Sequence, residues 1–154
     1  KCSDSSILRI MAENLFSQED KNRIVAAIAA AEMATSGEIQ VHIENHCASD
    51  VLDRAAEVFE TLKMHKTKER NAVLFYLAVA DHKFAILGDS GINKVVPENF
   101  WEKIKEEMAK SFKQHAFTEG LSNAIEACGQ QLKTHFPYDQ KGDVNELPDE
   151  ISFG

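Results

Sequence analysis

The sequence predicts an α/β domain built on a small mixed sheet, and three patterns carry this prediction. Residues 38–44 (EIQVHIE) alternate strictly between apolar and polar side chains, which is typical of a strand with one wet face. Residues 71–80 (NAVLFYLAVA) are apolar on both faces, as expected of a central strand that is covered on both sides. The segments around these two strands repeat their apolar residues at helical spacing, so we expect helices to provide that cover.

Two helices are expected before the first strand. Segment 5–15 is expected to form a short helix with four apolar residues on one side: Ile7, Leu8, Met11 and Leu15. A second helix follows at once, because Ser17 can cap it and apolar residues then recur at helical spacing up to Ala31. Gly37 lies just past the last periodic residue, which predicts that this helix ends close to it.

The same signals predict the remaining elements. A helix is expected over residues 50–64, and a third strand over 83–87 after a tight two-residue connection at 81–82. A long helix is expected over 97–112, with the proline at its first position, where a missing N–H costs nothing. The apolar spacing predicts a last helix over 118–132.

The domain organisation follows from where these elements end. Residues 1–137 are expected to form a single domain, because one chain of this size buries one core. Residues 138–154 are acidic, and the stretch from Pro137 to the last residue holds two of the three prolines. We expect them to form a tail that is either extended or packed on the domain.

The charge balance limits the partners. The chain has 17 Lys and Arg against 25 Asp and Glu, a net charge of −8, and no basic patch breaks this balance. Nucleic acid and anionic membrane surfaces need clustered Lys and Arg, so neither is an expected partner, whereas cations suit the chain. No apolar run approaches the roughly 20 residues that span a bilayer, so no membrane insertion is expected. We expect a soluble monomer.

Polar residues are expected to meet at one edge of the sheet. A right-handed crossover makes the first two strands parallel, and the hairpin makes the third antiparallel to the second. The starts of strands one and two therefore lie beside the end of strand three, which brings Glu38, Asn71 and Asp89 together. Carboxylate and amide oxygens are ligands for Ca²⁺ or Mg²⁺, so this edge is a candidate metal site. The alternative is structural: Asp89 caps its turn and Glu38 pairs with Arg70.

The opposite edge offers a second candidate site. The carboxyl end of strand one carries Glu44, Asn45 and His46, and the hairpin carries Asp81 and His82. Open α/β sheets often bind ligands outside the carboxyl ends of parallel strands. With only two parallel strands expected, we prefer to interpret this edge as a polar hairpin tip. No nucleophile motif such as GxSxG or a P-loop is present.

Three segments resemble the TPM domain family: FSQEDKNRIVAAIAAAEMATSGEIQVHIE, RNAVLFYLAVADHKFAILGDSGI and FTEGLSNAIEACGQQL. The resemblance implies a three-layer α/β/α sandwich around a small mixed sheet of three to four strands. Some members of the family bind calcium or hydrolyse phosphate esters weakly, so the resemblance also implies that the edge with Glu38, Asn71 and Asp89 is the family's polar crevice. Ala72 replaces a glycine that is common in the family, which narrows this crevice.

The chain also departs from many bacterial relatives in the family. Those relatives carry a low-complexity tail or a membrane anchor, and the sequence shows neither. This difference slightly favours a cytoplasmic protein. Because the chain begins at Lys1, an exported form whose leader has been removed stays open as well.

The patterns lead to three functional hypotheses. The first is a divalent-cation-binding domain, for Ca²⁺ or Mg²⁺, that acts as an accessory or interaction module. The alternative is a weak metal-assisted phosphatase for phosphate monoesters, in which Glu38 or Asp89 acts as base and Arg70 steers the phosphate. The third is a domain that binds a protein partner through its acidic tail or through the exposed face of strand one, formed by Gln40, His42 and Glu44.

Overall fold

The computed structural model describes residues 16–114, 116–137 and 151–153, so the helix expected over 5–15 lies outside the described residues. Its sheet has four strands in the order β3-β2-β1-β4. These are β1 (Glu38–Glu44), β2 (Ala72–Ala78), β3 (Lys83–Gly88) and β4 (Ser152–Phe153). β1 runs parallel to β2 and to β4, and β3 is antiparallel to β2. The predicted mixed sheet is therefore confirmed.

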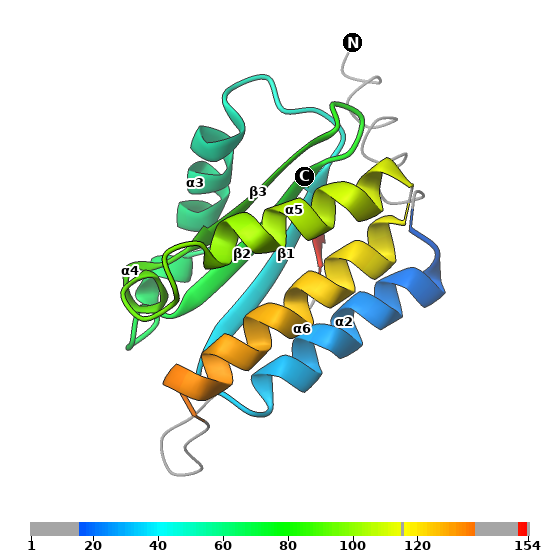
Figure 1. The fold of residues 1–154 in the computed structure, drawn as a ribbon. Coiled ribbons are helices and arrows are strands. Elements are labelled where there is room, and N and C mark those ends of the chain that lie inside the picture. The colour runs from blue at the N-terminus through cyan, green and yellow to red at the C-terminus, as the bar shows by residue number, and fades with distance from the viewer. Residues whose placement is uncertain (1–15, 115, 138–150, 154) are drawn as a thin grey trace.

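Helices cover both faces of the sheet, as the predicted three-layer sandwich requires. One face carries α2 (Gln18–Glu32), α5 (Phe100–Lys113) and α6 (Phe117–His135), with α6 between the other two (Figure 1). The other face carries α3 (Val51–Thr61), which packs on β3 and β2. Two short elements complete the described fold: the 3₁₀ turn η1 (Met64–Lys66) and α4 (Ser90–Asn93). No helix in the described residues is long and apolar enough to cross a membrane.

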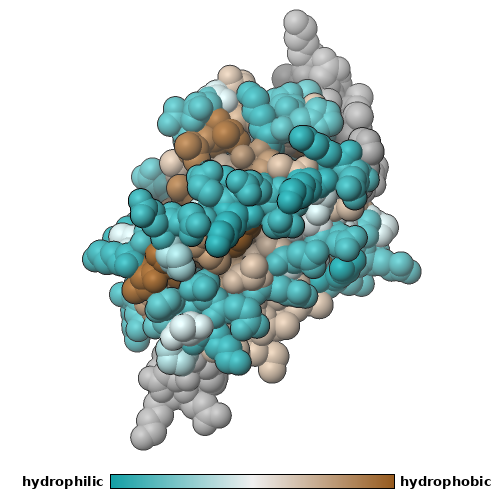
Figure 2. Space-filling view, viewed as in Figure 1, coloured by the Kyte–Doolittle hydropathy of each residue, from teal (hydrophilic) through white to brown (hydrophobic). Residues whose placement is uncertain are grey.

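The two faces of the sheet bury separate apolar clusters. The larger lies under α2, α5 and α6 and contains Ile39, Val41 and Ile43 of β1 together with Val73, Phe75 and Leu77 of β2. The smaller lies under α3 and contains Ala72, Leu74 and Tyr76 of β2. Because side chains alternate along a strand, the remaining residues of β1 point to the α3 side. The outer surface of α5 and α6 is mainly hydrophilic, as Figure 2 shows.

The predicted helix starts are right in two cases and wrong in a third. Ser17 and Asp20 form a capping box at α2, and Asp50 caps α3 by accepting from the backbone N–H groups of Leu52 and Asp53. Pro97 was expected to open α5, but α5 begins three residues later with Asn99 as its N-cap residue. Here the proline begins a separate turn, in which the Phe100 N–H donates to the Pro97 carbonyl at 3.0 Å.

The hairpin is longer than predicted. β2 ends at Ala78 and β3 begins at Lys83, so the connection has four residues instead of two. The reason is that Val79 and Ala80 still donate to the carbonyls of Glu44 and Asn45 at 2.9 and 2.8 Å, which extends the contact with β1. His82 then completes the turn at a positive φ of 53°.

The expectation that strand one has a wet face is wrong. Gln40, His42 and Glu44 are only 2, 8 and 6 % exposed. Strict alternation shows that the two faces of a strand differ in polarity, but not that the polar face meets water. These three side chains therefore do not offer an exposed surface through which a protein partner could bind.

Candidate functional site

The predicted site residues lie at one edge of the sheet, where β1 and β2 begin and β3 ends. Glu38 is in register with Ala72, and Val73 is in register with Gly88. This arrangement brings Glu38, Asn71 and Asp89 to the same edge, and all three are buried, with exposed fractions of 3, 2 and 7 %. Buried polar side chains need partners, so the partners show how each residue is used.

Asp89 is held by Arg70 and by its own helix. Arg70 donates from Nε to Oδ2 at 2.6 Å and from Nη2 to Oδ1 at 2.8 Å, and Ser90 N–H donates to Oδ1 at 2.8 Å. The hydrogen bond to Asp89 raises the pKa of the Arg70 guanidinium. Asp89 is thus the N-cap of α4, as the structural alternative expected. That alternative paired Arg70 with Glu38, whereas the guanidinium pairs with Asp89.

Asn71 belongs to a second group with Ser36 and Glu69. Ser36 Oγ donates to Glu69 Oε2 at 2.6 Å, and the Asn71 amide nitrogen lies 3.3 Å from both of these oxygens. The oxygen and nitrogen of an asparagine amide are assigned from their neighbours. Rotation of the amide by half a turn would direct its oxygen at the same two atoms. Glu69 was not among the predicted ligands, and its only signal in the sequence is its position two residues before Asn71.

A close backbone contact holds the two groups together. Gly91 N–H donates to the Arg70 carbonyl at 2.7 Å, and Asp89 N–H donates to the Ala72 carbonyl at 2.9 Å. A Cβ atom at Gly91 would lie 2.0 Å from the Glu69 carbonyl oxygen. Segment 89–91 therefore lies directly against segment 69–72, and this approach is what requires a glycine.

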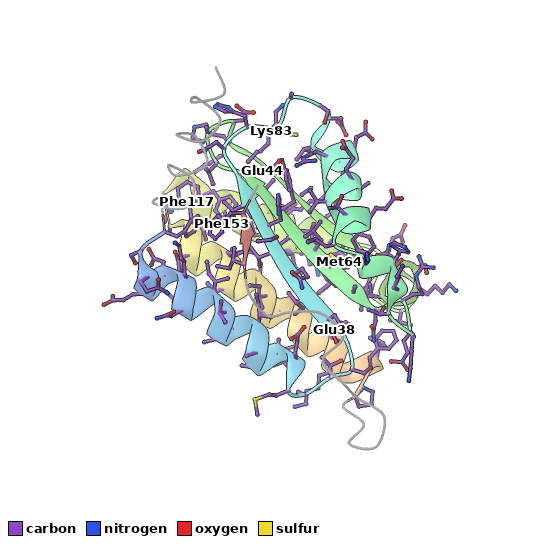
Figure 3. The ribbon with its side chains drawn as sticks, turned by 180° about the vertical axis from the view of Figure 1, so that it is seen from behind. Glu38, Glu44, Met64, Lys83, Phe117 and Phe153 are labelled. Carbon is purple, nitrogen blue, oxygen red and sulfur yellow. The ribbon has the colours of Figure 1, made fainter. Side chains whose placement is uncertain are left out.

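Glu38 reaches the edge from the α3 side of the sheet. Its register partner Ala72 belongs to the cluster under α3, and partners in a parallel ladder point to the same face. Glu38 is the first of a row of polar residues on β1 that continues with Gln40, His42 and Glu44. Figure 3 shows Glu38 and Glu44 at the two ends of this strand.

Glu44 is the centre of a buried polar network at the opposite end of β1. Arg54 donates to it at 3.0 and 2.6 Å, Tyr76 Oη donates to it as well, and His42 Nε2 lies 3.3 Å from its Oε1. Burial raises the pKa of Glu44, but the hydrogen bonds outweigh burial and hold that pKa far below its usual range. Burial and the hydrogen bond to Glu44 raise the pKa of Tyr76.

The hairpin beside this network fits its interpretation as a polar tip. Asp81 lies 2.9 Å from His46 Nδ1 and accepts from Cys47 N–H at 2.7 Å, so it connects the hairpin to the chain after β1. The hydrogen bond with His46 lowers the pKa of Asp81. Asp81 and His46 thus have a structural use at this end.

The donor set at the first edge determines which ions it can bind. Within the described residues, no group of three or more His, Cys, Asp or Glu side chains is arranged to hold a metal ion. Ser36 and Glu69 bring together a hydroxyl and a carboxylate oxygen, while Asn71 directs its amide nitrogen at both. With that amide turned, the three side chains offer only oxygens, which are hard ligands that suit Ca²⁺ or Mg²⁺ better than Zn²⁺.

Comparisons with known proteins agree with this fold. The family model of the TPM domain matches residues 10–131. The NMR structure of BA42 protein from the psychrophilic bacterium Bizionia argentinensis is similar, with 46 % identity, a TM-score of 0.84, and coverage of 90 % of this chain and 95 % of that chain. The N-terminal domain of cg2496 protein from Corynebacterium glutamicum shares the fold at 14 % identity, with a TM-score of 0.61 and coverage of 76 and 74 %. No curated protein sequence matches significantly. This chain belongs to the TPM domain family.

Proposed function

We propose that this TPM domain binds a divalent cation, Ca²⁺ or Mg²⁺, at the edge of the sheet where β1 and β2 begin, and that it acts as an accessory or interaction module. One observation carries the proposal: Ser36 Oγ, Glu69 Oε2 and the Asn71 side-chain amide meet within 2.6 to 3.3 Å of one another. Of the ligands predicted from the sequence, Asn71 has the most direct support from this geometry.

The composition of the group suggests weak binding. Sites with one carboxylate and neutral oxygens bind Ca²⁺ with dissociation constants of roughly millimolar, because ligand charge sets much of the affinity. Glu38 and Asp89 lie at the same edge and are the further carboxylates that would strengthen the site. Glu38 and Asp89 therefore stay predicted ligands.

Arg70 would compete with a bound cation for the carboxylate of Asp89. Its guanidinium already neutralises Asp89 through two hydrogen bonds, so its positive charge opposes the binding of a cation at the same carboxylate. Replacing Arg70 by glutamine should therefore tighten cation binding if Asp89 is a ligand. It should leave binding nearly unchanged if only Ser36, Glu69 and Asn71 hold the ion.

The experiment that tests the proposal is a titration with Ca²⁺, and then with Mg²⁺, followed by backbone amide NMR shifts. We expect saturable shifts at residues 36–38 and 69–71, and at least about tenfold weaker binding in Glu69→Gln, because the variant loses the ligand charge. Glu57→Gln is the matched control, since it removes an exposed carboxylate on α3. Shifts that appear only around Glu44 and Asp81, or no shifts at all, would contradict the proposal.

Phosphate monoester hydrolysis stays the alternative, with less support from the geometry. Arg70, the predicted phosphate-steering residue, uses Nε and Nη2 on Asp89, so a phosphate would have to share it. Turnover of an aryl phosphate that disappears in Asp89→Ala, with folding intact, would favour the phosphatase. Turnover that is unchanged in this variant would assign the activity to a contaminant.

A further inference from the structure

A small cavity lies at the end of the sheet opposite the proposed cation site. It has a volume of about 230 Å³, opens to the surface, and is lined by the end of β2, the β2–β3 hairpin, the last turns of α5 and the start of α6. Figure 3 shows two residues of this region, Lys83 and Phe117, at the end of the molecule away from Glu38. Neither the TPM family match nor the proposed cation site assigns a role to this cavity.

The interior of the cavity is aromatic. Phe84, Phe112 and Phe117 line it, and Leu77 and Ala78 contribute further apolar surface. The rings of Phe84 and Phe112 meet edge to face with centroids 5.2 Å apart, and the rings of Phe112 and Phe117 are also 5.2 Å apart. Aromatic rings arranged in this way offer both faces and edges to another ring. The lining therefore favours an aromatic guest over a polar one.

The same cavity also carries two lysines. Lys83 and Lys113 are exposed and belong to the lining together with His82, and none of the described lining residues is acidic. Neither lysine forms an ion pair within the described part of the chain, although the positive charge of Lys83 contributes to the low pKa of nearby Asp81. Asp81 itself is engaged by His46 and Cys47. In a chain with a net charge of −8, this is a local concentration of positive charge.

We propose that this cavity binds a small aromatic carboxylate, with the ring among Phe84, Phe112 and Phe117 and the carboxylate toward Lys83 and Lys113. The volume fits one ring, because a cavity of about 150 Å³ is enough for benzene and the remainder accommodates a short acidic side arm. The apolar lining supplies affinity for the ring, and the two lysines distinguish an acid from its neutral amide. A ligand of this size binds with a dissociation constant of roughly millimolar or below.

The test is an amide NMR titration of the full chain with phenylacetate, and with phenylacetamide as the neutral comparison. We expect saturable shifts at residues 77–84 and 112–117, with the amide binding about tenfold more weakly because it lacks the charge. The double variant Lys83→Gln and Lys113→Gln should lose a similar factor for phenylacetate and none for phenylacetamide. Lys110→Gln is the matched control, because Lys110 lies on the same helix and pairs with Glu107 at 3.4 Å.

A second variant tests whether the aromatic ring of the ligand lies inside the cavity. Ala109 lines the cavity, so Ala109→Leu fills part of it and should weaken both ligands by about tenfold while the remaining spectrum stays folded. Equal affinity for the acid and the amide, or shifts that Ala109→Leu leaves unchanged, would overturn the proposal. The absence of saturable shifts up to about ten millimolar would overturn it too. None of these outcomes depends on Ca²⁺, so the two proposals fail independently.

Discussion

Arg70 and Asp89 form a two-point ion pair, with Nε 2.6 Å from Oδ2 and Nη2 2.8 Å from Oδ1. The same carboxylate also accepts from Ser90 N–H and so caps α4. One side chain therefore fixes the arginine before β2 and the helix after β3. Whatever the edge binds, Asp89 positions two of its segments.

Replacing Asp89 separates its two tasks. Asp89→Ala should destabilise the protein by about 1 kcal/mol through loss of the cap alone, with the loss of the ion pair added to it. Asp89→Asn should destabilise it less, because an asparagine caps a helix as well as an aspartate does. Urea unfolding of both variants measures the difference. Equal destabilisation would mean that the ion pair, and not the cap, accounts for the stability.

Breaking the polar network around Glu44 should lower the free energy of unfolding more than loss of the Asp89 cap does. Arg54→Ala leaves a buried carboxylate without its guanidinium partner, and we expect a loss of about 3 kcal/mol in the free energy of unfolding. Glu57→Gln is the control, because Glu57 is the exposed partner of the same arginine at 3.6 Å and should cost under about 0.5 kcal/mol. Denaturant unfolding checks both. A small effect of Arg54→Ala would show that water replaces the guanidinium at Glu44.

The low pKa of Glu44 predicts that the free energy of unfolding falls at acidic pH. Its pKa in the folded protein lies far below the ordinary 4.5, because hydrogen bonds from Arg54, His42 and Tyr76 outweigh the opposing effect of burial. A carboxylate with a lowered folded-state pKa contributes stability above its unfolded pKa, and this contribution is lost as the pH falls below 4.5 toward the folded pKa. Urea midpoints measured from neutral to acidic pH should show the loss.

The variant Glu44→Gln tests whether the loss of stability at acidic pH comes from Glu44. It should be less stable than the parent at neutral pH, with a smaller further loss below pH 4.5, because it no longer titrates. Glu57→Gln should keep the acid dependence of the parent. A Glu44→Gln variant with the full acid dependence would assign the loss to other carboxylates.

Gly91 is expected to tolerate no side chain. A Cβ atom there would lie 2.0 Å from the Glu69 carbonyl oxygen and 2.6 Å from the Arg70 carbonyl oxygen, so the backbone would have to move. We expect Gly91→Ala to cost about 3 kcal/mol and to shift the amide resonances of residues 69–72. In Gly88→Ala the Cβ would instead meet the side chain of Trp101 at 2.7 Å, and side chains move more easily. A smaller loss in Gly91→Ala than in Gly88→Ala would contradict this account.

The sheet could be predicted because its signals are local. The alternation of residues 38–44, the doubly apolar run 71–80 and the right-handed crossover rule define two parallel strands. The hairpin adds the antiparallel third strand and so defines the edge where Glu38, Asn71 and Asp89 meet. β4 has no such signal. Ser152 and Phe153 form two residues of strand only because β1 offers them an edge, and that edge is distant in sequence.

The pairing of polar side chains could not be predicted in the same way. The sequence places Arg70 near both Glu38 and Asp89, and only the path of segment 89–91 against segment 69–72 selects Asp89. The burial of Gln40, His42 and Glu44 has the same origin. It depends on long-range contacts, such as His42 Nδ1 with Ser152 Oγ at 2.8 Å, that no short pattern encodes.

Because β4 pairs with β1, we expect Ser152 and Phe153 to stabilise the sheet. Phe153 packs against the larger core cluster and lies 5.3 Å from Lys21 Nζ, while Ser152 Oγ donates to the Val41 carbonyl at 3.3 Å. Phe153→Ala should cost about 1 to 2 kcal/mol through lost apolar burial, and Ser152→Ala about 1 kcal/mol through lost hydrogen bonds. Thermal or urea unfolding of both variants measures these losses.

Removing residues 151–154 tests the strand as a whole. The deletion leaves the backbone of His42 and Ile43 without its β4 partner, and a free strand edge promotes pairing between molecules. We therefore expect lower stability together with concentration-dependent association, measured by size-exclusion chromatography. Association that also appears in Phe153→Ala would come from lost packing, because that variant keeps the backbone of β4. Association confined to the deletion would assign to β4 the task of protecting the edge of β1.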